Sequence, residues 1–375
     1  MKGCIEDKRR GVYITFGSRT VFSGVEKKIQ NQIAVFSNYF QMQHICIEKP
    51  SFSYVKSLIW RLPFGSIDRE YDKYITEIYQ YDFIYIRYNY IDRKYYKFLQ
   101  ELKNNNPKAK IIVEIPTYPY DEEIKGNIAN LPFLIKDRIY RKKLAGIIDR
   151  FVTFSDHDKI YGISTIKTHN GIIVDDVKAV SGKFNDDKCV LLAVAQMACH
   201  HGYERIIQGL HSYYASNKVS IPVYLFLVGE GKETQSYKKL ADKFELQDKV
   251  IFFPKTYGEK LDNLYNISDI ALGSFGMYKI NFYGKASILK SRESLAAGML
   301  FVNGCKLDVL DETNDYYLEY PNDDSEIDIT KIIEFYMKHK NNATKQELSE
   351  EIRNYARKKV DMEAVLNPII QYLLE

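Results

Sequence analysis

Short apolar segments alternate with longer amphipathic segments along the first half of the chain. Apolar runs at 11–16, 82–87 and 110–115 have the length of buried strands and are bounded by turn-forming or polar residues. Stretches with helical periodicity lie among them at 25–40 and 92–104. This spacing of strands and helices predicts an α/β domain with a parallel sheet. Further strand-like segments are 44–48, 151–154 and 166–173.

A polar, charged stretch at 175–188 is interpreted as a linker, because a second series of the same kind follows it. The strands expected in this series are 189–195, 222–228, 249–253, 269–273 and 299–303. The helices expected between them are 203–216, 233–244, 258–266 and 287–297, and an amphipathic helical tail occupies about 345–375. No internal repeat with a period of 20–50 residues is present.

The pattern therefore predicts two Rossmann-like domains that face a central cleft. We expect the first at 1–172 and the second at 173–356, with a C-terminal helix at about 357–375 packing back on the first domain. In open α/β sheets, ligands bind beyond the carboxyl ends of the strands. The loops after 195, 229 and 254 and the helix at 287 should consequently face one cleft.

The segment from Ser287 to Gly298 carries the most informative chemistry. It is predicted to be a short helix with a serine cap and a glycine stop. Lys290 and Arg292 lie in or near its first turn, where cations oppose the helix dipole. Free N–H groups at a helix start attract anions, so the two cations favour a phosphate or diphosphate in front of them.

Composition narrows the class of protein. The 375 residues carry a net charge of +4, but residues 1–180 contain 29 basic and 21 acidic residues, a surplus of +8. This surplus favours an anionic partner. No run of about 18 apolar residues predicts a membrane span, and the first residues lack the apolar part of a secretory signal. The five cysteines form no CxxC pair, which argues against a zinc site and for a reducing cytosol.

Four segments resemble a known family when they are taken in order. They are 195–210 (AQMACHHGYERIIQGL), 227–231 (LVGEG), 264–270 and 290–298 (KSRESLAAG). Together they resemble the nucleotide-sugar domain of family 4 retaining glycosyltransferases, which have the two-domain GT-B architecture. The segments 86–88 (IRY) and 114–120 (EIPTYPY) resemble the acceptor half of a subgroup from bacterial capsule and exopolysaccharide gene clusters.

The resemblance implies roles for individual residues. Glu293 would accept hydrogen bonds from the donor ribose hydroxyls, and its alternative is an ordinary exposed helical residue. Arg205 and Lys290 would stabilise the charge that the diphosphate gains as the glycosidic bond breaks, and each could instead be a solvated surface charge. Arg292 is interpreted equally well as a phosphate contact or as a solvated residue. The remaining candidates for donor binding are Gly17, Gly24, His201, Gly202, Gly229, Lys255, Thr256, Ser287 and Leu289.

Several of these candidates belong to loops. Gly17 and Gly24 would permit close approach of the backbone to the donor phosphate from the first domain. The loop that contains Lys255 and Thr256 would lie beside the base. No dedicated metal or other cofactor is expected, because cations and a helix start serve the diphosphate.

The chain departs from the family pattern at three places. His201 stands before Gly202 where the family usually has a lysine, so the charge there depends on pH. Lys285 occupies the position of the first glutamate of the family's paired motif, which leaves the donor sugar unassigned. The region of the expected catalytic histidine holds Glu114 instead. We expect Glu114 to face the cleft as a catalytic residue, unless it is merely a charge at a strand end.

The segment 132–144 combines apolar residues with five cations and one acid. It suits a helix that lies on an anionic membrane surface, or an amphipathic helix that packs on its own domain. The surplus of positive charge in this half favours the first interpretation.

The hypothesis from the sequence is a cytoplasmic enzyme, peripheral on the inner face of the plasma membrane. It would be a retaining hexosyltransferase that moves a sugar from a nucleoside diphosphate, most simply UDP, to a growing, lipid-linked bacterial surface glycan. The alternative is a catalytically silent subunit with the same fold that binds a partner enzyme or a glycan. No nucleic-acid-binding signature is present, so nucleic acid is not expected as a partner.

Overall fold

The computed structural model describes residues 8–17, 24–48, 60, 62, 65–66, 69–121, 131–216, 219–311 and 313–375. The chain divides into two compact units. Unit 1 contains residues 1–169 and 365–375, and unit 2 contains residues 170–364. Each unit is built around a parallel sheet, which confirms the predicted α/β class.

Unit 1 holds a seven-stranded sheet in the order β2-β1-β3-β4-β5-β7-β6, parallel except for β6 against β7. Its strands are β1 (Arg10–Gly17), β2 (Gln41–Glu48), β3 (Phe83–Arg87), β4 (Lys110–Ile115), β5 (Arg150–Thr153), β6 (Lys159–Ile160) and β7 (Ile163–Lys167). Its helices are α1 (Gly24–Tyr39), α3 (Tyr71–Glu77), α4 (Arg93–Asn105) and α6 (Leu131–Tyr140), and a 3-10 turn, η2 (Arg141–Lys143), follows α6. The central strands are apolar on both faces because helices cover both sides of the sheet.

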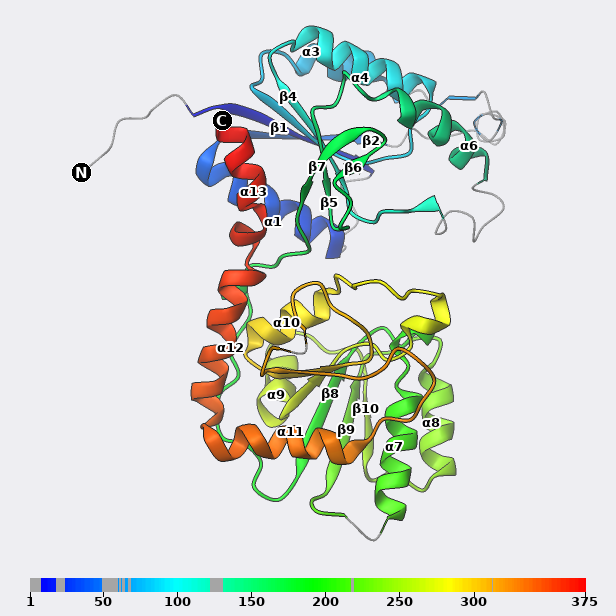
Figure 1. Cartoon of the computed structure of the whole chain (residues 1–375), viewed down its shortest axis with the longest axis vertical. Coiled ribbons are helices and arrows are strands. Elements are labelled where there is room, and N and C mark those ends of the chain that lie inside the picture. Colours follow the sequence, from blue (N-terminus) through cyan, green and yellow to red (C-terminus); the bar gives the residue numbers. More distant parts are fainter. Residues whose placement is uncertain are drawn as a thin grey trace, which may run out of the picture. The chain divides into compact units, whose positions relative to one another are not determined.

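Unit 2 holds a six-stranded parallel sheet in the order β10-β9-β8-β11-β12-β13. Its strands are β8 (Cys189–Val194), β9 (Val223–Val228), β10 (Val250–Phe253), β11 (Ile270–Leu272), β12 (Leu300–Asn303) and β13 (Tyr317–Glu319). Its helices are α7 (Glu204–Ala215), α8 (Thr234–Lys243), α9 (Glu259–Ile267), α10 (Leu289–Ala297), α11 (Ile329–Asn342) and α12 (Lys345–Lys359). Figure 1 shows α7 and α8 together on one side of this sheet.

The C-terminal helix α13 (Met362–Leu374) returns to unit 1 (Figure 1). Thr168 donates a hydrogen bond of 2.6 Å to the carbonyl of Val365, and Lys110 donates one of 2.6 Å to the carbonyl of Tyr372. These contacts tie the two ends of α13 to the residue after β7 and to the start of the central strand β4. The helical tail is thus two helices, α12 and α13, that belong to different units.

Candidate functional site

A cavity of about 470 Å³ opens at the carboxyl end of the sheet in unit 2. Its floor comes from the ends of β8 and β9, at Ala195 and Gly229, and from the loop after β10. One wall is the start of α10, which contributes Lys290 and Glu293. This is the place where parallel α/β sheets bind ligands, because strand ends and helix N-termini meet there.

Five residues that the sequence singled out line this cavity. They are Gly229, Lys255, Thr256, Lys290 and Glu293. The cavity also contains Gln196 and Glu230, which the sequence reasoning did not single out. Gln196 directly follows one predicted strand and Glu230 lies two residues after another, so the rule on strand ends could have found them.

Gly229 is required by the shape of the cavity floor. Its backbone has φ of +113°, which L side chains rarely adopt, and a Cβ there would lie 2.2 Å from the carbonyl oxygen of Ala195. The loops after β8 and β9 therefore pack tightly enough to leave the space above them open.

The start of α10 lacks a side-chain cap, contrary to the sequence prediction. The helix begins at Leu289, and Ile288 occupies the cap position in an extended conformation without a side-chain hydrogen bond. The Ser287 hydroxyl instead accepts a hydrogen bond of 3.0 Å from the backbone N–H of Asn170. The first-turn N–H groups of α10 thus receive no side-chain cap and retain the partial positive charge of a helix start.

Lys290 and His201 meet at this helix start. The Ala198 backbone N–H donates a 3.0 Å hydrogen bond to His201 Nδ1, which places the proton of the neutral ring on Nε2. Lys290 Nζ contacts this Nε2 atom. Two hydrogen-bond donors consequently lie side by side, an arrangement that favours an acceptor with negative charge within reach of both.

The local electrostatics follow from this geometry. Burial, together with the charge of Lys290, lowers the pKa of His201 to about 3, so the imidazole stays neutral at physiological pH. Burial also lowers the pKa of Lys290 to about 8, and the Glu293 carboxylate opposes this shift. Lys290 therefore changes its charge within a physiologically relevant pH range.

Gly202 has a packing role that the sequence did not predict. Its φ is +62°, and a Cβ would lie 2.5 Å from the backbone nitrogen of Gly276. The neighbouring loop is also fixed by a 2.7 Å hydrogen bond from Phe275 N–H to the His201 carbonyl. Gly202 thus permits this loop contact and does not itself line the described cavity.

The predicted role of Arg205 as a phosphate contact is not compatible with its position. The residue is 1% exposed. Its guanidinium donates hydrogen bonds to the carbonyls of Phe275 (2.7 Å) and Pro321 (3.1 Å) and pairs with Asp323 at 3.3 Å. Arg205 therefore holds two loops of unit 2 together, and all its described partners are protein groups.

Arg292 is also placed differently from either sequence interpretation. It is 0% exposed and donates to both carboxylate oxygens of Asp308 at 2.6 Å. Its Nε donates to the carbonyl of Asn170 at 3.0 Å. Arg292 is neither solvated nor directed at the cavity, since it fastens α10 to the surrounding chain.

Leu289, at 37% exposed, and Lys285, which is exposed, also lie outside the described cavity lining.

The first-domain candidates are located in unit 1. Gly17 ends β1 and lines a separate cavity of that unit, whereas Gly24 is the first residue of α1. Ser23, which precedes it, lies outside the described residues. Neither glycine lines the cavity of unit 2.

Glu114 is buried in the core of unit 1 and does not face a cavity as the sequence predicted. Its side chain is 0% exposed and forms ion pairs with Arg87 at 3.0 Å and Lys28 at 3.5 Å. Tyr85 and Gln32 donate hydrogen bonds of 2.7 and 2.8 Å to its second oxygen. Residues of α1 and β3 thus surround the carboxylate, which anchors the helix to the sheet.

We expect Glu114→Gln to destabilise the protein by about 3 kcal/mol, because it leaves two buried cations without their carboxylate. Burial alone would raise the pKa of Glu114, but Lys28 and Arg87 outweigh it and lower the pKa to about 2, from an ordinary value of 4.5. A depressed carboxylate pKa stabilises the fold above pH 4.5, and this stabilisation is lost as the pH falls towards 2.

Denaturant unfolding at several pH values measures both effects. The wild type should lose stability between pH 4.5 and 2, and Glu114→Gln should lose less over that window. Exposed Glu101, in α4 of the same unit, provides the control variant Glu101→Gln. Equal stability of Glu114→Gln and wild type at pH 7 would contradict the anchoring role.

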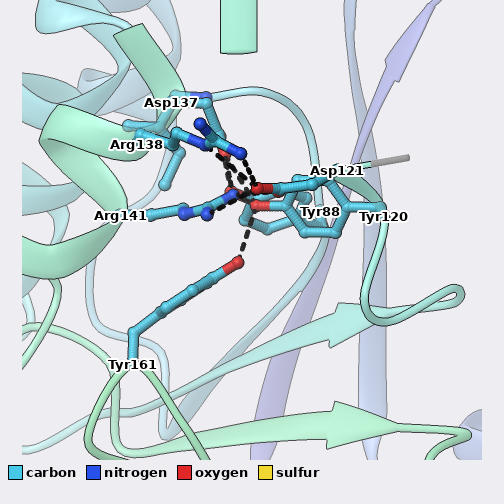
Figure 2. A network of polar contacts seen from close by, with 8 residues as sticks. Tyr88, Tyr120, Asp121, Asp137, Arg138, Arg141 and Tyr161 are labelled. Atoms are coloured by element: carbon cyan, nitrogen blue, oxygen red, sulfur yellow. Dashed lines mark hydrogen bonds and ion pairs between the residues drawn. The ribbon is translucent and has the colours of Figure 1, made fainter. Parts of the chain in front are cut away.

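A second buried network lies in unit 1 around Asp137 of α6 (Figure 2). Tyr88 and Tyr120 donate hydrogen bonds of 2.6 and 2.7 Å to its carboxylate, and Arg141 lies 3.1 Å away. Burial raises the pKa of Asp137. Figure 2 shows these side chains converging from the loops after β3 and β4 and from the end of α6, so the network fixes the loops against the helix.

His157 is an exposed side chain that the sequence reasoning missed. It follows β5 and lies edge-on to the Tyr118 ring, with ring centroids 4.9 Å apart. Its Nδ1 contacts the Ser155 hydroxyl at 3.0 Å. The family resemblance places a histidine at 114–120, after β4, where this sequence has none. In the structure His157, which follows the next strand β5, lies beside Tyr118 of that segment.

The described residues contain neither a candidate metal site nor a candidate membrane-spanning helix. In the described ranges, no group of three or more His, Cys, Asp or Glu side chains could hold a metal ion. Within the same ranges, no helix has the length and apolar character needed to cross a bilayer.

Comparisons with known proteins agree with this architecture. Residues 175–276 match the family model of glycosyl transferases group 1, and no curated protein matches the chain. Among solved structures, the chain is similar to a glycosyltransferase from Rickettsia africae ESF-5, at 14% identity and a TM-score of 0.61, covering 99% of this chain and 100% of that one.

Two further structures are similar over the whole chain. One is Anabaena Alr3699/HepE in complex with UDP, at 12% identity and a TM-score of 0.63, covering 97% of this chain and 99% of that one. The other is the apo form of the lipopolysaccharide outer core galactosyltransferase WaaB, at 12% identity and a TM-score of 0.59, covering 97% and 99%. The chain therefore has the GT-B fold, as the sequence predicted, and the segment that matches the group 1 model lies within unit 2.

Proposed function

We propose that this chain, with its group 1 domain and GT-B fold, is a retaining hexosyltransferase that uses a nucleoside diphosphate sugar. The observation that carries the proposal is the cavity of unit 2, where an uncapped helix start and Lys290 adjoin Glu293. Cations and helix N-termini stabilise a diphosphate, and a carboxylate accepts hydrogen bonds from a diol. The UDP complex of the similar Anabaena protein supports UDP as the nucleotide.

The arrangement of these residues around the cavity supports the following proposed roles. The loop of Lys255 and Thr256 would lie beside the base, and Glu293 would bind the ribose. Lys290, the Nε2–H group of His201 and the first turn of α10 would hold the diphosphate and stabilise its increasing charge as the bond to the sugar breaks. Each of these groups belongs to unit 2.

We further propose that the acceptor is a growing, lipid-linked glycan of a bacterial surface and that the enzyme works at the cytoplasmic face of the plasma membrane. Support comes from the surplus charge of residues 1–180 and from one face of α6. Leu131, Ile135 and Ile139, spaced one turn apart, are 45%, 40% and 43% exposed. Arg138 and Lys142 are exposed nearby. Apolar side chains beside cations suit an anionic lipid surface.

Donor hydrolysis by the purified protein tests the proposed function. A panel of nucleotide sugars should contain at least one donor that is hydrolysed, and Glu293→Gln should weaken UDP binding about tenfold, since a hydrogen bond to a charged group is lost. Binding of pyrophosphate, which has no ribose, should be unchanged or tighter. Exposed Glu334 of α11 provides the control Glu334→Gln.

The rival function is a silent subunit, favoured by the neutral His201 in the position of the family's lysine. Such a subunit should bind no UDP and hydrolyse no donor. If neither activity is found and Glu293→Gln changes nothing, the proposed enzyme function is wrong.

Replacing Ile135 and Ile139 by aspartate tests the membrane proposal. The pair of substitutions should reduce sedimentation with vesicles rich in anionic lipid at least tenfold, because it removes apolar area and adds repulsion. Donor hydrolysis in solution should not change, since neither residue lines the cavity of unit 2. Equal vesicle binding by the variant and the wild type would contradict the role of this face.

A further inference from the structure

Unit 1 contains a cavity of about 320 Å³ of its own. It lies at the carboxyl end of the sheet, where Gly17 ends β1 and where Asn89 and Tyr90 follow β3. Trp60 and Phe133 come from segments outside the strands. The position is the one at which open α/β sheets bind ligands, and the residues that line it are absent from the cavity of unit 2.

Aromatic side chains are the most frequent kind in its wall, five of the eleven lining residues. The rings of Trp60 and Phe133 lie with centroids 4.2 Å apart and an interplanar angle of 38°. Phe16, Tyr71 and Tyr90 complete the aromatic lining. Aromatic faces bind flat, amphipathic rings whose C–H groups carry partial positive charge, since the face of an aromatic ring is negative. A sugar ring has this character.

The charged residues of the cavity have different roles. Asp92 caps α4, accepting hydrogen bonds of 2.9 Å from Lys94 N–H and Tyr95 N–H. Lys136 donates hydrogen bonds to the backbone carbonyls of Trp60 and Gly65, so its charge already has two partners.

Arg69 is the charged group left to bind a ligand. Its guanidinium lies 5.5 Å over the Phe16 ring, and among the described residues it makes a long 3.5 Å contact with the Glu48 carbonyl. No carboxylate in the described part of the chain pairs with it. A guanidinium has five N–H donors in a planar fork that matches phosphate and carboxylate. Arg69 therefore gives the aromatic cavity a place for an anion.

The network of Figure 2 fixes two walls of this cavity. Asp137 accepts a 3.0 Å hydrogen bond from Ile91 N–H and one of 2.6 Å from the hydroxyl of Tyr88. Ile91 lines the cavity, and Lys136 is the neighbour of Asp137 in α6. The loop after β3 and the helix are thus held at a set separation. A preformed cavity of this kind binds with less loss of conformational freedom.

We infer that this cavity is the acceptor site and that it takes a sugar ring bearing an anionic group. The ring lies against Trp60 and Phe133, and the anion pairs with Arg69. The inference rests on the proposed function, because a glycosyltransferase must bind an acceptor as well as a donor. The anion is a phosphate attached to the sugar or the carboxylate of an acidic sugar, and both share the chemistry that Arg69 recognises.

Trp60 is the one tryptophan of the chain, so tryptophan fluorescence reports on this cavity alone. We expect α-D-glucose 1-phosphate and D-glucuronate to change the emission saturably, each at a concentration several times lower than D-glucose. The tighter of the two identifies the anion as phosphate or carboxylate. Arg69→Gln should weaken glucose 1-phosphate binding about tenfold and leave glucose binding unchanged.

Arg93→Gln is the matched control, since Arg93 is exposed at the start of α4 and does not line the cavity. UDP binding by calorimetry confirms that each variant is folded and that the site of unit 2 is intact. If UDP binds but no sugar changes the emission, or if Arg69→Gln binds all three probes as the wild type does, the acceptor inference is overturned while the proposed function stands. Absence of both UDP binding and donor hydrolysis would instead overturn the proposed function.

Discussion

Replacing Lys290 by glutamine should lower kcat for donor hydrolysis at pH 7 by about a hundredfold or more. Removal of one preorganised group that stabilises developing negative charge typically has an effect of this size. Lys290 meets the requirement because it lies in the first turn of α10, lines the cavity and contacts His201. Single-turnover kinetics with the preferred nucleotide sugar would measure the effect.

Lys285→Gln is the appropriate control for Lys290→Gln. Lys285 is an exposed cation five residues earlier, outside the described lining of the cavity. Its replacement should change kcat less than twofold and should leave pyrophosphate binding intact, whereas Lys290→Gln should weaken it. A Lys290→Gln enzyme within threefold of the wild type would remove this lysine from the proposed transition-state contacts.

The affinity for UDP should fall about tenfold for each pH unit above pH 8. Lys290 has a pKa of about 8 without ligand because burial lowers it, against the opposing effect of the Glu293 carboxylate. Bound diphosphate accepts from Lys290 and from the Nε2–H group of His201, which favours protonated Lys290 and raises its pKa. UDP binding therefore takes up one proton above pH 8. The phosphates of UDP are already fully ionised there, so they do not contribute to the slope.

The titratable groups around Lys290 do not obscure this effect. His201 stays neutral, burial also lowers the pKa of His200, and Glu293 and Glu230 are carboxylates on the cavity wall. Lys290→Arg provides the control, because a guanidinium remains charged throughout the range. Calorimetry between pH 7 and 9 should show a sloping profile for the wild type and a flat one for this variant. Identical profiles would contradict a proton-linked Lys290.

The sequence predicted both sheets, and its rule on strand ends leads to the edge of the second sheet where the cavity of unit 2 lies. Strands β8 and β9 are apolar runs, and topology brings the loops after them to one edge, which includes Gly229. Lys290 was predicted because it follows a helix-start signal and precedes the helix-stop residue Gly298, and Glu293 because its segment resembles the family's glutamate motif. Strands and helix ends follow from the local order of apolar and polar residues, and the meeting of the loops follows from the geometry of parallel sheets.

Charged residues with distant partners could not be predicted in the same way. Arg205 is fixed by Asp323, which lies 118 residues away, and Arg292 by Asp308. Nothing in the sequence near either arginine identifies these partners. Glu114 stands near a strand end that suggested exposure, but Lys28 and Gln32 of α1 cover it. The prediction that Ser287 caps α10 was wrong, because its hydroxyl accepts a hydrogen bond from the Asn170 backbone N–H and none from the helix start.

A crystal structure of the chain with UDP tests the central claim most directly. The account predicts the diphosphate at the start of α10 within hydrogen-bonding distance of Lys290 Nζ, the ribose hydroxyls on the Glu293 carboxylate, and the base beside Lys255 and Thr256. UDP bound elsewhere in the molecule, or in this cavity with the diphosphate away from Lys290, would contradict it.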